Sequence, residues 1–125
     1  MEEAGLIDSV SIQYVDYRNV TGQFAHIVSI EMFEAVGREY WKPFFDICGR
    51  LLKPGGTMLL QTIAIRDKDR AVPMRASGWI SKYIFPGGIL PAVGEIRDCL
   101  EQTSRNMRIS DELDIGHHYV LTLNE

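Results

Sequence analysis

The sequence has little of several features that would assign it to a class at once. Its 125 residues include only two cysteines, Cys48 and Cys99, which are too few for a disulfide framework or a zinc site and fit a reducing compartment. No apolar run approaches the roughly 20 residues that span a bilayer, and residues 1–7 are too acidic and too poor in apolar side chains for a signal peptide. The 13 basic residues are outnumbered by 17 acidic ones, which argues against nucleic acid as a partner.

What remains is the composition of an ordinary globular domain. Hydrophobic residues make up 46% of the chain and charged residues 24%, so disorder is not the expected state. The chain has no repeat, low-complexity tract or linker. We therefore expect a single domain over residues 1–125.

Apolar periodicity predicts alternating strands and helices. The run around residue 27 is apolar almost throughout, as in a parallel strand that is buried on both faces. The expected strands cover 9–16, 24–30, 57–65 and 107–115. The expected helices cover 32–36, 38–52, 78–85, 92–103 and a stretch from 117. This alternation predicts an α/β fold with a mostly parallel, doubly wound sheet.

Apolar residues at helical spacing identify the expected core. One stripe lies in the long helix, which the Lys-Pro-Gly-Gly turn at 53–56 should end. Its members are Trp41, Phe44, Phe45, Cys48, Leu51 and Leu52. A second stripe lies in the helix after 91 and consists of Val93, Ile96, Cys99 and Leu100.

Polar side chains fall where the expected strands end, which is where parallel sheets bind ligands. Asp16 either accepts hydrogen bonds from a ribose or an adenine amine, or caps a turn. Glu34 is either a partly desolvated carboxylate that orients a base or holds a proton, or a solvated glutamate in a first helical turn. Gln61 interrupts an apolar strand, so its amide needs partners in the protein or in a ligand.

Two further stretches carry weaker signals. Residues 66–88 form an insertion of mixed basic and aromatic residues, which suits a membrane surface or the entrance for an acyl chain, or a solvated loop over an apolar patch. His117 and His118 are adjacent, and adjacent side chains on a helix diverge, so no metal ligand set is predicted.

Several motifs together resemble the cyclopropane-fatty-acyl-phospholipid synthases, including the mycolic-acid cyclopropane synthases. Their order and spacing agree over about Gly5 to Glu125, nearly the whole chain. The Lys-Pro-Gly-Gly turn is common among methyltransferases, whereas Tyr-Ile-Phe-Pro-Gly-Gly-Ile-Leu-Pro is highly specific. The matching stretches are IVSIEMFEAVG at 27–37, LLKPGG at 51–56, LQTI at 60–63, YIFPGGILP at 83–91 and HY at 118–119.

The resemblance implies a Rossmann-like methyltransferase that uses S-adenosylmethionine. In such enzymes a methyl group is delivered to a cis double bond of an unsaturated acyl phospholipid, and a bound bicarbonate removes a proton so that the cyclopropane ring closes. By position, Glu34 resembles the glutamate that holds bicarbonate, Tyr119 its tyrosine partner and Ile63 a backbone N–H donor. Gln61 stands where better-known members have histidine, and an amide cannot change its charge with pH.

The resemblance also implies a cofactor site and a location. Asp16, with Tyr17 beside it, resembles the acidic residue that contacts the adenine of the cofactor. The insertion resembles the segment over the acyl channel, so we expect a cytoplasmic protein that is peripheral to the inner membrane face.

Parts of the family pattern have no counterpart in the chain. The Gly-x-Gly loop that approaches the cofactor is absent, as are the first strands and the final antiparallel strand. We therefore expect a partial Rossmann-like sheet and weak or no activity for this chain alone. The alternative is a non-catalytic module that binds lipid or protein and dimerises through an exposed sheet edge.

Overall fold

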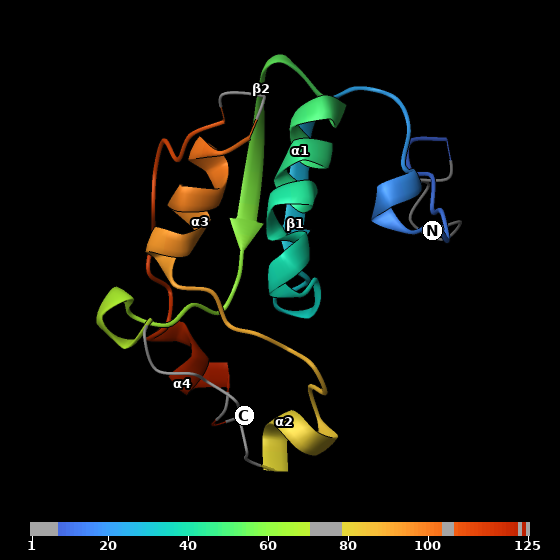
Figure 1. The fold of residues 1–125 in the computed structure, drawn as a ribbon. Coiled ribbons are helices and arrows are strands. Elements are labelled where there is room, and N and C mark those ends of the chain that lie inside the picture. The colour runs from blue at the N-terminus through green and yellow to red at the C-terminus, as the bar shows by residue number, and fades with distance from the viewer. Residues whose placement is uncertain (1–7, 71–78, 104–106, 123, 125) are drawn as a thin grey trace.

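Two parallel strands joined by a helix form the centre of the structure (Figure 1). The computed structural model describes residues 8–70, 79–103, 107–122 and 124. Strand β1 covers Phe24–Ile30, helix α1 covers Trp41–Leu51 and strand β2 covers Leu52–Gln61. The α/β class and the parallel pairing predicted from the sequence are therefore confirmed.

The connection from β1 to α1 consists of two short 3-10 turns. Phe33–Ala35 and Arg38–Tyr40 form turns η2 and η3, and Gly37 between them has a φ of 85°, which a glycine adopts without strain. The expected helix at 32–36 is thus a single 3-10 turn. Pro43 lies in the first turn of α1, where its missing N–H costs no helical hydrogen bond.

The two strands come closest at a glycine near the start of β2. A Cβ atom on Gly56 would lie 2.8 Å from the carbonyl oxygen of Ala25, so only glycine fits there. The pairing register between the strands shifts near this glycine: Phe24 pairs with Leu52, whereas His26 pairs with Thr57. The expected strand at 57–65 is confirmed in part, since β2 begins earlier and ends at Gln61.

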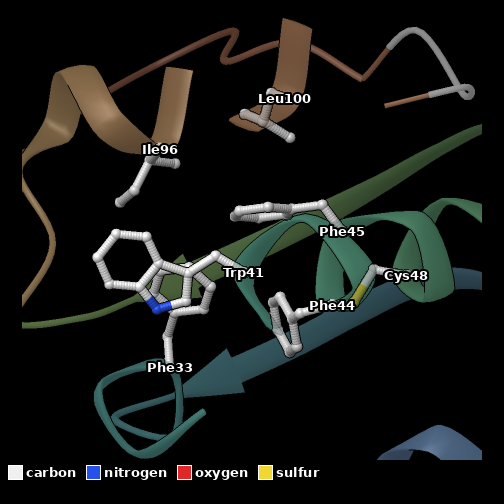
Figure 2. Packing of buried hydrophobic residues seen from close by; sticks show 7 residues of the cluster. All are labelled: Phe33, Trp41, Phe44, Phe45, Cys48, Ile96 and Leu100. Carbon is white, nitrogen blue, oxygen red and sulfur yellow. The ribbon is translucent and has the colours of Figure 1, made fainter. Parts of the chain in front are cut away.

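The core lies on one face of the sheet, between α1 and helix α3, which covers Val93–Glu101 (Figure 2). Phe33 is completely buried, and its ring lies between 5.2 and 5.4 Å from three other aromatic rings, measured between centroids. Those rings belong to Trp41, Phe44 and Phe45, and Figure 2 shows Ile96 and Leu100 of α3 above them. The predicted stripe of α1 is confirmed as core except for Leu52, which is half-buried and begins β2.

Short elements surround this unit. Turn η1 covers Tyr17–Asn19 and turn η4 covers Asp67–Asp69. Helix α2 covers Trp79–Tyr83 and helix α4 covers His118–Thr122, so both expected helices exist in shorter form. No helix of the described residues is long and apolar enough to cross a membrane.

Two expected strands, at 9–16 and at 107–115, are wrong. Both segments are irregular, because alternation of apolar residues makes a strand only where a partner strand accepts its hydrogen bonds. In the part of the chain that the structure describes, the sheet holds β1 and β2 alone.

The expectation that β1 is buried on both faces is also wrong. Ser29 points to the core and is buried, whereas Val28 is 62% exposed and Ile30 is 59% exposed. The helices α1 and α3 contact the same cluster of core residues, so the opposite face of the sheet has no cover from the described residues.

Candidate functional site

The carboxyl ends of β1 and β2 bring together two of the residues that the sequence singled out, Glu34 and Ile63. The backbone N–H of Ile63 donates a hydrogen bond to Oε1 of Glu34 over 2.5 Å. The other carboxylate oxygen of Glu34, Oε2, is buried and has no hydrogen-bond partner among the described residues. The backbone carbonyl of Glu34 accepts a hydrogen bond from the N–H of Ile89 over 3.0 Å. Glu34 therefore links the end of β2 to the chain that follows the insertion, while one of its oxygens remains available as an acceptor.

Gln61, the last residue of β2, is oriented by Glu31, an acidic residue that the sequence also places directly after the strand at 24–30. Its side-chain Nε2 donates to Oε1 of Glu31 over 3.2 Å, and its backbone carbonyl oxygen accepts from the backbone N–H of Glu31 over 2.9 Å. Glu31 has a φ of 50°, the only positive φ of a non-glycine residue in the described part of the chain. A left-handed backbone costs such a residue about 1–2 kcal/mol, and strain of this kind gathers at functional sites.

Asp16 and Tyr17 lie in and beside turn η1, not at the end of a strand. Asp16 caps this turn: Oδ1 accepts from the backbone N–H of Arg18 over 2.9 Å, and Oδ2 accepts from its guanidinium over 2.6 Å. The side-chain and backbone hydrogen bonds from Arg18 lower the pKa of Asp16 to about 2. The turn-cap alternative for Asp16 is therefore what the structure shows, and its contact with a cofactor stays a prediction.

Tyr17 lies beside a cleft of about 320 Å³ next to the Glu34 turn. Its ring meets Phe44 edge-on at 5.5 Å between centroids, and burial raises the pKa of its phenol. Most of the side chains that line the cleft are aromatic or apolar. They are Tyr17, Arg18, Met32, Ala35, Val36 and Tyr40.

Tyr119 is not joined to Glu34 by any contact between described residues. It lies in α4 and is 37% exposed. Figure 1 shows α4 on the side of the molecule toward which the arrow of β2 points. The partnership of Tyr119 with Glu34 therefore stays a prediction.

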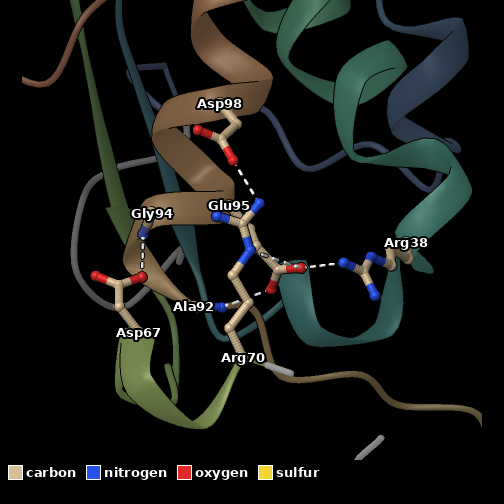
Figure 3. A network of polar contacts seen from close by, with 7 residues as sticks. All are labelled: Arg38, Asp67, Arg70, Ala92, Gly94, Glu95 and Asp98. Atoms are coloured by element: carbon tan, nitrogen blue, oxygen red, sulfur yellow. Dashed lines mark hydrogen bonds and ion pairs between the residues drawn. The ribbon is translucent and has the colours of Figure 1, made fainter. Parts of the chain in front are cut away.

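A buried carboxylate in α3 anchors the chain around this site (Figure 3). Oε1 of Glu95 pairs with the guanidinium of Arg38, in η3, and lies 3.7 Å from Nε of Arg70. Its Oε2 accepts from the N–H of Ala92 over 3.0 Å. The sequence reading missed Glu95, although an acidic residue directly before the inward-facing Ile96 was a signal for it. The contacts fix the start of the insertion and the chain after Glu34 to one helix.

No group of three or more potential metal-ligating side chains occurs in the described residues. His117 and His118 meet edge-on, with their ring centroids 4.0 Å apart.

Comparisons with known proteins agree with this arrangement. The family model for mycolic acid cyclopropane synthetase matches residues 1–125. The chain is 39% identical over 120 residues to the tuberculostearic acid methyltransferase UfaA1 of Mycobacterium tuberculosis. The match covers 96% of this chain and 28% of that protein. It is 42% identical over 114 residues to the cyclopropane-fatty-acyl-phospholipid synthase of Escherichia coli K12. That match covers 91% of this chain and 28% of the synthase.

Solved structures give the same result for the fold. The mycolic acid cyclopropane synthase CmaA1, solved with SAH and CTAB, superposes with a TM-score of 0.74 at 27% identity, over 98% of this chain and 47% of that one. The cyclopropane synthase MmaA2 of Mycobacterium tuberculosis shares the fold with a TM-score of 0.77 at 24% identity, over 97% of this chain and 47% of that one. This chain, with Glu34 held at the carboxyl end of its parallel sheet, belongs to the mycolic acid cyclopropane synthetase family.

Proposed function

We propose that the chain supplies the substrate side of a methyltransferase site that acts on unsaturated acyl phospholipids with S-adenosylmethionine as the methyl donor. The observation that carries the proposal is Glu34, whose Oε1 is fixed by Ile63 while its Oε2 is buried and unpartnered. Membership of the family supports the same chemistry. Because the chain spans 28% of its two relatives, the activity is proposed for the site and not for these residues acting alone.

Glu34 would act on the positive charge that methyl transfer creates. When bound, S-adenosylmethionine would supply a methyl group from its sulfonium. Transfer of that methyl, with cleavage of its bond to sulfur, would leave a cation on the acyl chain. A carboxylate nearby lowers the energy of such a cation, most strongly where water is excluded. The buried Oε2 of Glu34 is available to accept the proton that the acyl cation would lose.

The cleft beside Tyr17 fits part of the cofactor. Aromatic and apolar walls suit the adenine ring, whereas both carboxylate oxygens of Asp16 already accept hydrogen bonds from Arg18. We therefore expect the isolated chain to bind S-adenosylmethionine weakly or not at all. Isothermal titration tests this expectation, and tight binding by the isolated monomer would contradict it.

The described residues fit bicarbonate poorly. An anion needs several donors, yet the N–H of Ile63 is bonded to Glu34 and one of the two N–H groups of Gln61 is bonded to Glu31, which leaves a single amide N–H. The free oxygen of Glu34 is an acceptor and offers the anion only a bond from its own hydroxyl. No step of the proposed reaction is therefore assigned to bicarbonate.

The phospholipid substrate would reach the site from a membrane surface, with α2 as the contact. Trp79 is 65% exposed and Phe85 is 63% exposed, and the ammonium of Lys82 lies 5.0 Å from the ring centroid of Tyr83. Exposed aromatics beside a basic residue suit the interface of an anionic bilayer. These side chains support the proposal that the protein works in the cytoplasm, at the periphery of the inner membrane face.

Vesicle binding tests that contact. Co-sedimentation with vesicles of phosphatidylglycerol and phosphatidylethanolamine should fall for Trp79→Ala and stay unchanged for Tyr14→Ala, an exposed aromatic far from α2 in the sequence. Equal loss in the two variants would refute the assignment of α2.

The second candidate is a non-catalytic module that binds lipid or protein and dimerises. The exposed side chains of Val28 and Ile30, on a strand without a second neighbour among the described residues, favour it. Light scattering separates the two cases, because a monodisperse monomer at high concentration argues against pairing through this edge.

A chimaera tests the methyltransferase proposal directly. This chain would replace the matching 114-residue region of the Escherichia coli synthase, and transfer of labelled methyl from S-adenosylmethionine to phospholipid would be measured. Glu34→Gln removes the carboxylate and should abolish transfer, whereas Glu39→Gln, an exposed residue of η3, should not. Transfer that survives Glu34→Gln would overturn the role proposed for Glu34.

A further inference from the structure

The turn after β1 places a strained glutamate against the residue that ends β2. Ile30 and Gln61 form the last pair of the sheet, and the N–H of Glu31 extends the ladder by one bond to Gln61. The φ of 50° at Glu31 then bends the chain out of the strand direction. As a result the carboxylates of Glu31 and Glu34 both reach the end of β2.

The contact between Glu31 and Gln61 determines which atom of the amide faces Glu31. An ionised carboxylate only accepts hydrogen bonds, so the atom of Gln61 next to it is the nitrogen and not the oxygen. The two ends of an amide point in different directions, so the carbonyl oxygen Oε1 faces away from Glu31.

We propose that Glu31 is a positioning residue: its carboxylate holds the NH₂ group of Gln61, so that Gln61 offers its carbonyl oxygen as an acceptor at the end of β2. The strained φ is the conformation that brings Glu31 into reach. The consequence for ligands rests on the proposed function. A carbonyl oxygen carries partial negative charge. At the end of β2 it would stabilise the cation that methyl transfer creates and would repel an anion such as bicarbonate.

Three substitutions separate the side chain of Glu31 from its backbone. Glu31→Gln keeps an acceptor oxygen, Glu31→Ala removes the acceptor but keeps the strained φ, and Glu31→Gly removes the acceptor and relieves the strain. The readout is the NMR signal pair of the Gln61 side-chain amide in the 125-residue chain, together with its hydrogen exchange.

The proposal expects a pattern that general destabilisation would not give. In Glu31→Ala and Glu31→Gly the two amide signals should move to the positions of a free glutamine side chain and exchange faster, while Glu31→Gln should retain most of the original shift. Glu39→Gln is the matched control and should leave the signals unchanged. Signals that stay in place in Glu31→Ala and Glu31→Gly would overturn the positioning role.

The functional consequence is measured in the chimaera. Loss of one positioning hydrogen bond should lower kcat about five- to tenfold with little change in KM in Glu31→Ala, and Glu31→Gln should recover most of the rate. Added bicarbonate should not raise the methyl-transfer rate of the chimaera that keeps Glu31. If that chimaera required bicarbonate, the proposed preference of the site for a cation over an anion would be overturned. A chimaera without any methyl transfer would refute the proposed function, while the NMR result would still decide the role of Glu31.

Discussion

Replacement of Glu95 should test how far one buried carboxylate holds this structure together. The side chain is almost completely buried, and it joins α3 to Arg38 on one side and to Arg70 on the other. Glu95→Ala removes the hydrogen bond to the N–H of Ala92, the ion pair with Arg38 and the buried part of the stem.

Each loss has a known scale. A helix cap contributes about 1 kcal/mol, and a buried methylene contributes about 0.8 kcal/mol. The guanidinium of Arg38 is mostly exposed, so its ion pair counts as a surface pair worth about 1 kcal/mol at most. Glu95→Ala should therefore lower the free energy of unfolding by about 3 kcal/mol, and Glu95→Gln, which keeps the stem and a capping oxygen, by about 1 kcal/mol.

Urea unfolding followed by tryptophan fluorescence and far-UV circular dichroism measures both values. With a slope of about 1.5 kcal/mol per M, the midpoint should fall by about 2 M for Glu95→Ala. Glu101→Ala, an exposed residue of the same helix, is the matched control and should leave the midpoint nearly unchanged. If Glu95→Ala shifted the midpoint no further than the control, the structural role of the buried carboxylate would be refuted.

Three other measurements test separate features. Phe33→Ala should destabilise the chain by about 3–5 kcal/mol in the same assay, because Phe33 is completely buried among three rings; Phe85→Ala, at an exposed site, should change little, and equal effects would contradict the assigned core. The pKa of Asp16, followed by carbon-13 NMR, should lie near 2 and return toward its ordinary value in Arg18→Ala. Since this pKa is lowered in the fold, its contribution to stability is present above pH 3.8 and is lost as the pH falls through about 2; an unchanged pKa in Arg18→Ala would disprove the cause. Burial raises the pKa of Cys48 to about 11, so a thiol reagent at neutral pH should label the other cysteine first and Cys48 only on unfolding; rapid labelling of both thiols in the native protein would contradict that burial.

The central unit was predictable because its signals are local. A run of apolar residues marked β1, and the stripe from Trp41 to Leu51 marked the buried face of α1. The irregular segments at 9–16 and 107–115 alternate in the same way as strands do. Alternation cannot show whether a partner strand lies beside a segment, so both predictions failed.

The site was predictable in part for the same reason. Glu34 was found because it follows an apolar strand and Gln61 because it interrupts one. The structure adds the hydrogen bond that joins Glu34 to Ile63. The contact of Gln61 with Glu31 joins residues 30 positions apart and depends on a backbone angle that no local pattern reveals. The cap on Asp16 comes from Arg18, two residues away, and competes with any ligand role.

The insertion leaves and rejoins the sheet unit at neighbouring points. The N–H of Ile65 donates to the carbonyl of Pro91 over 2.9 Å, and Ile65 pairs with Ala92 in an isolated parallel bridge. A loop whose two ends already touch can be lengthened, shortened or exchanged at little entropic cost, because closure entropy grows only slowly with loop length. Evolution can therefore vary residues 66–88, and an engineer can graft a different segment between the same two ends, while β1, β2 and Glu34 keep their positions.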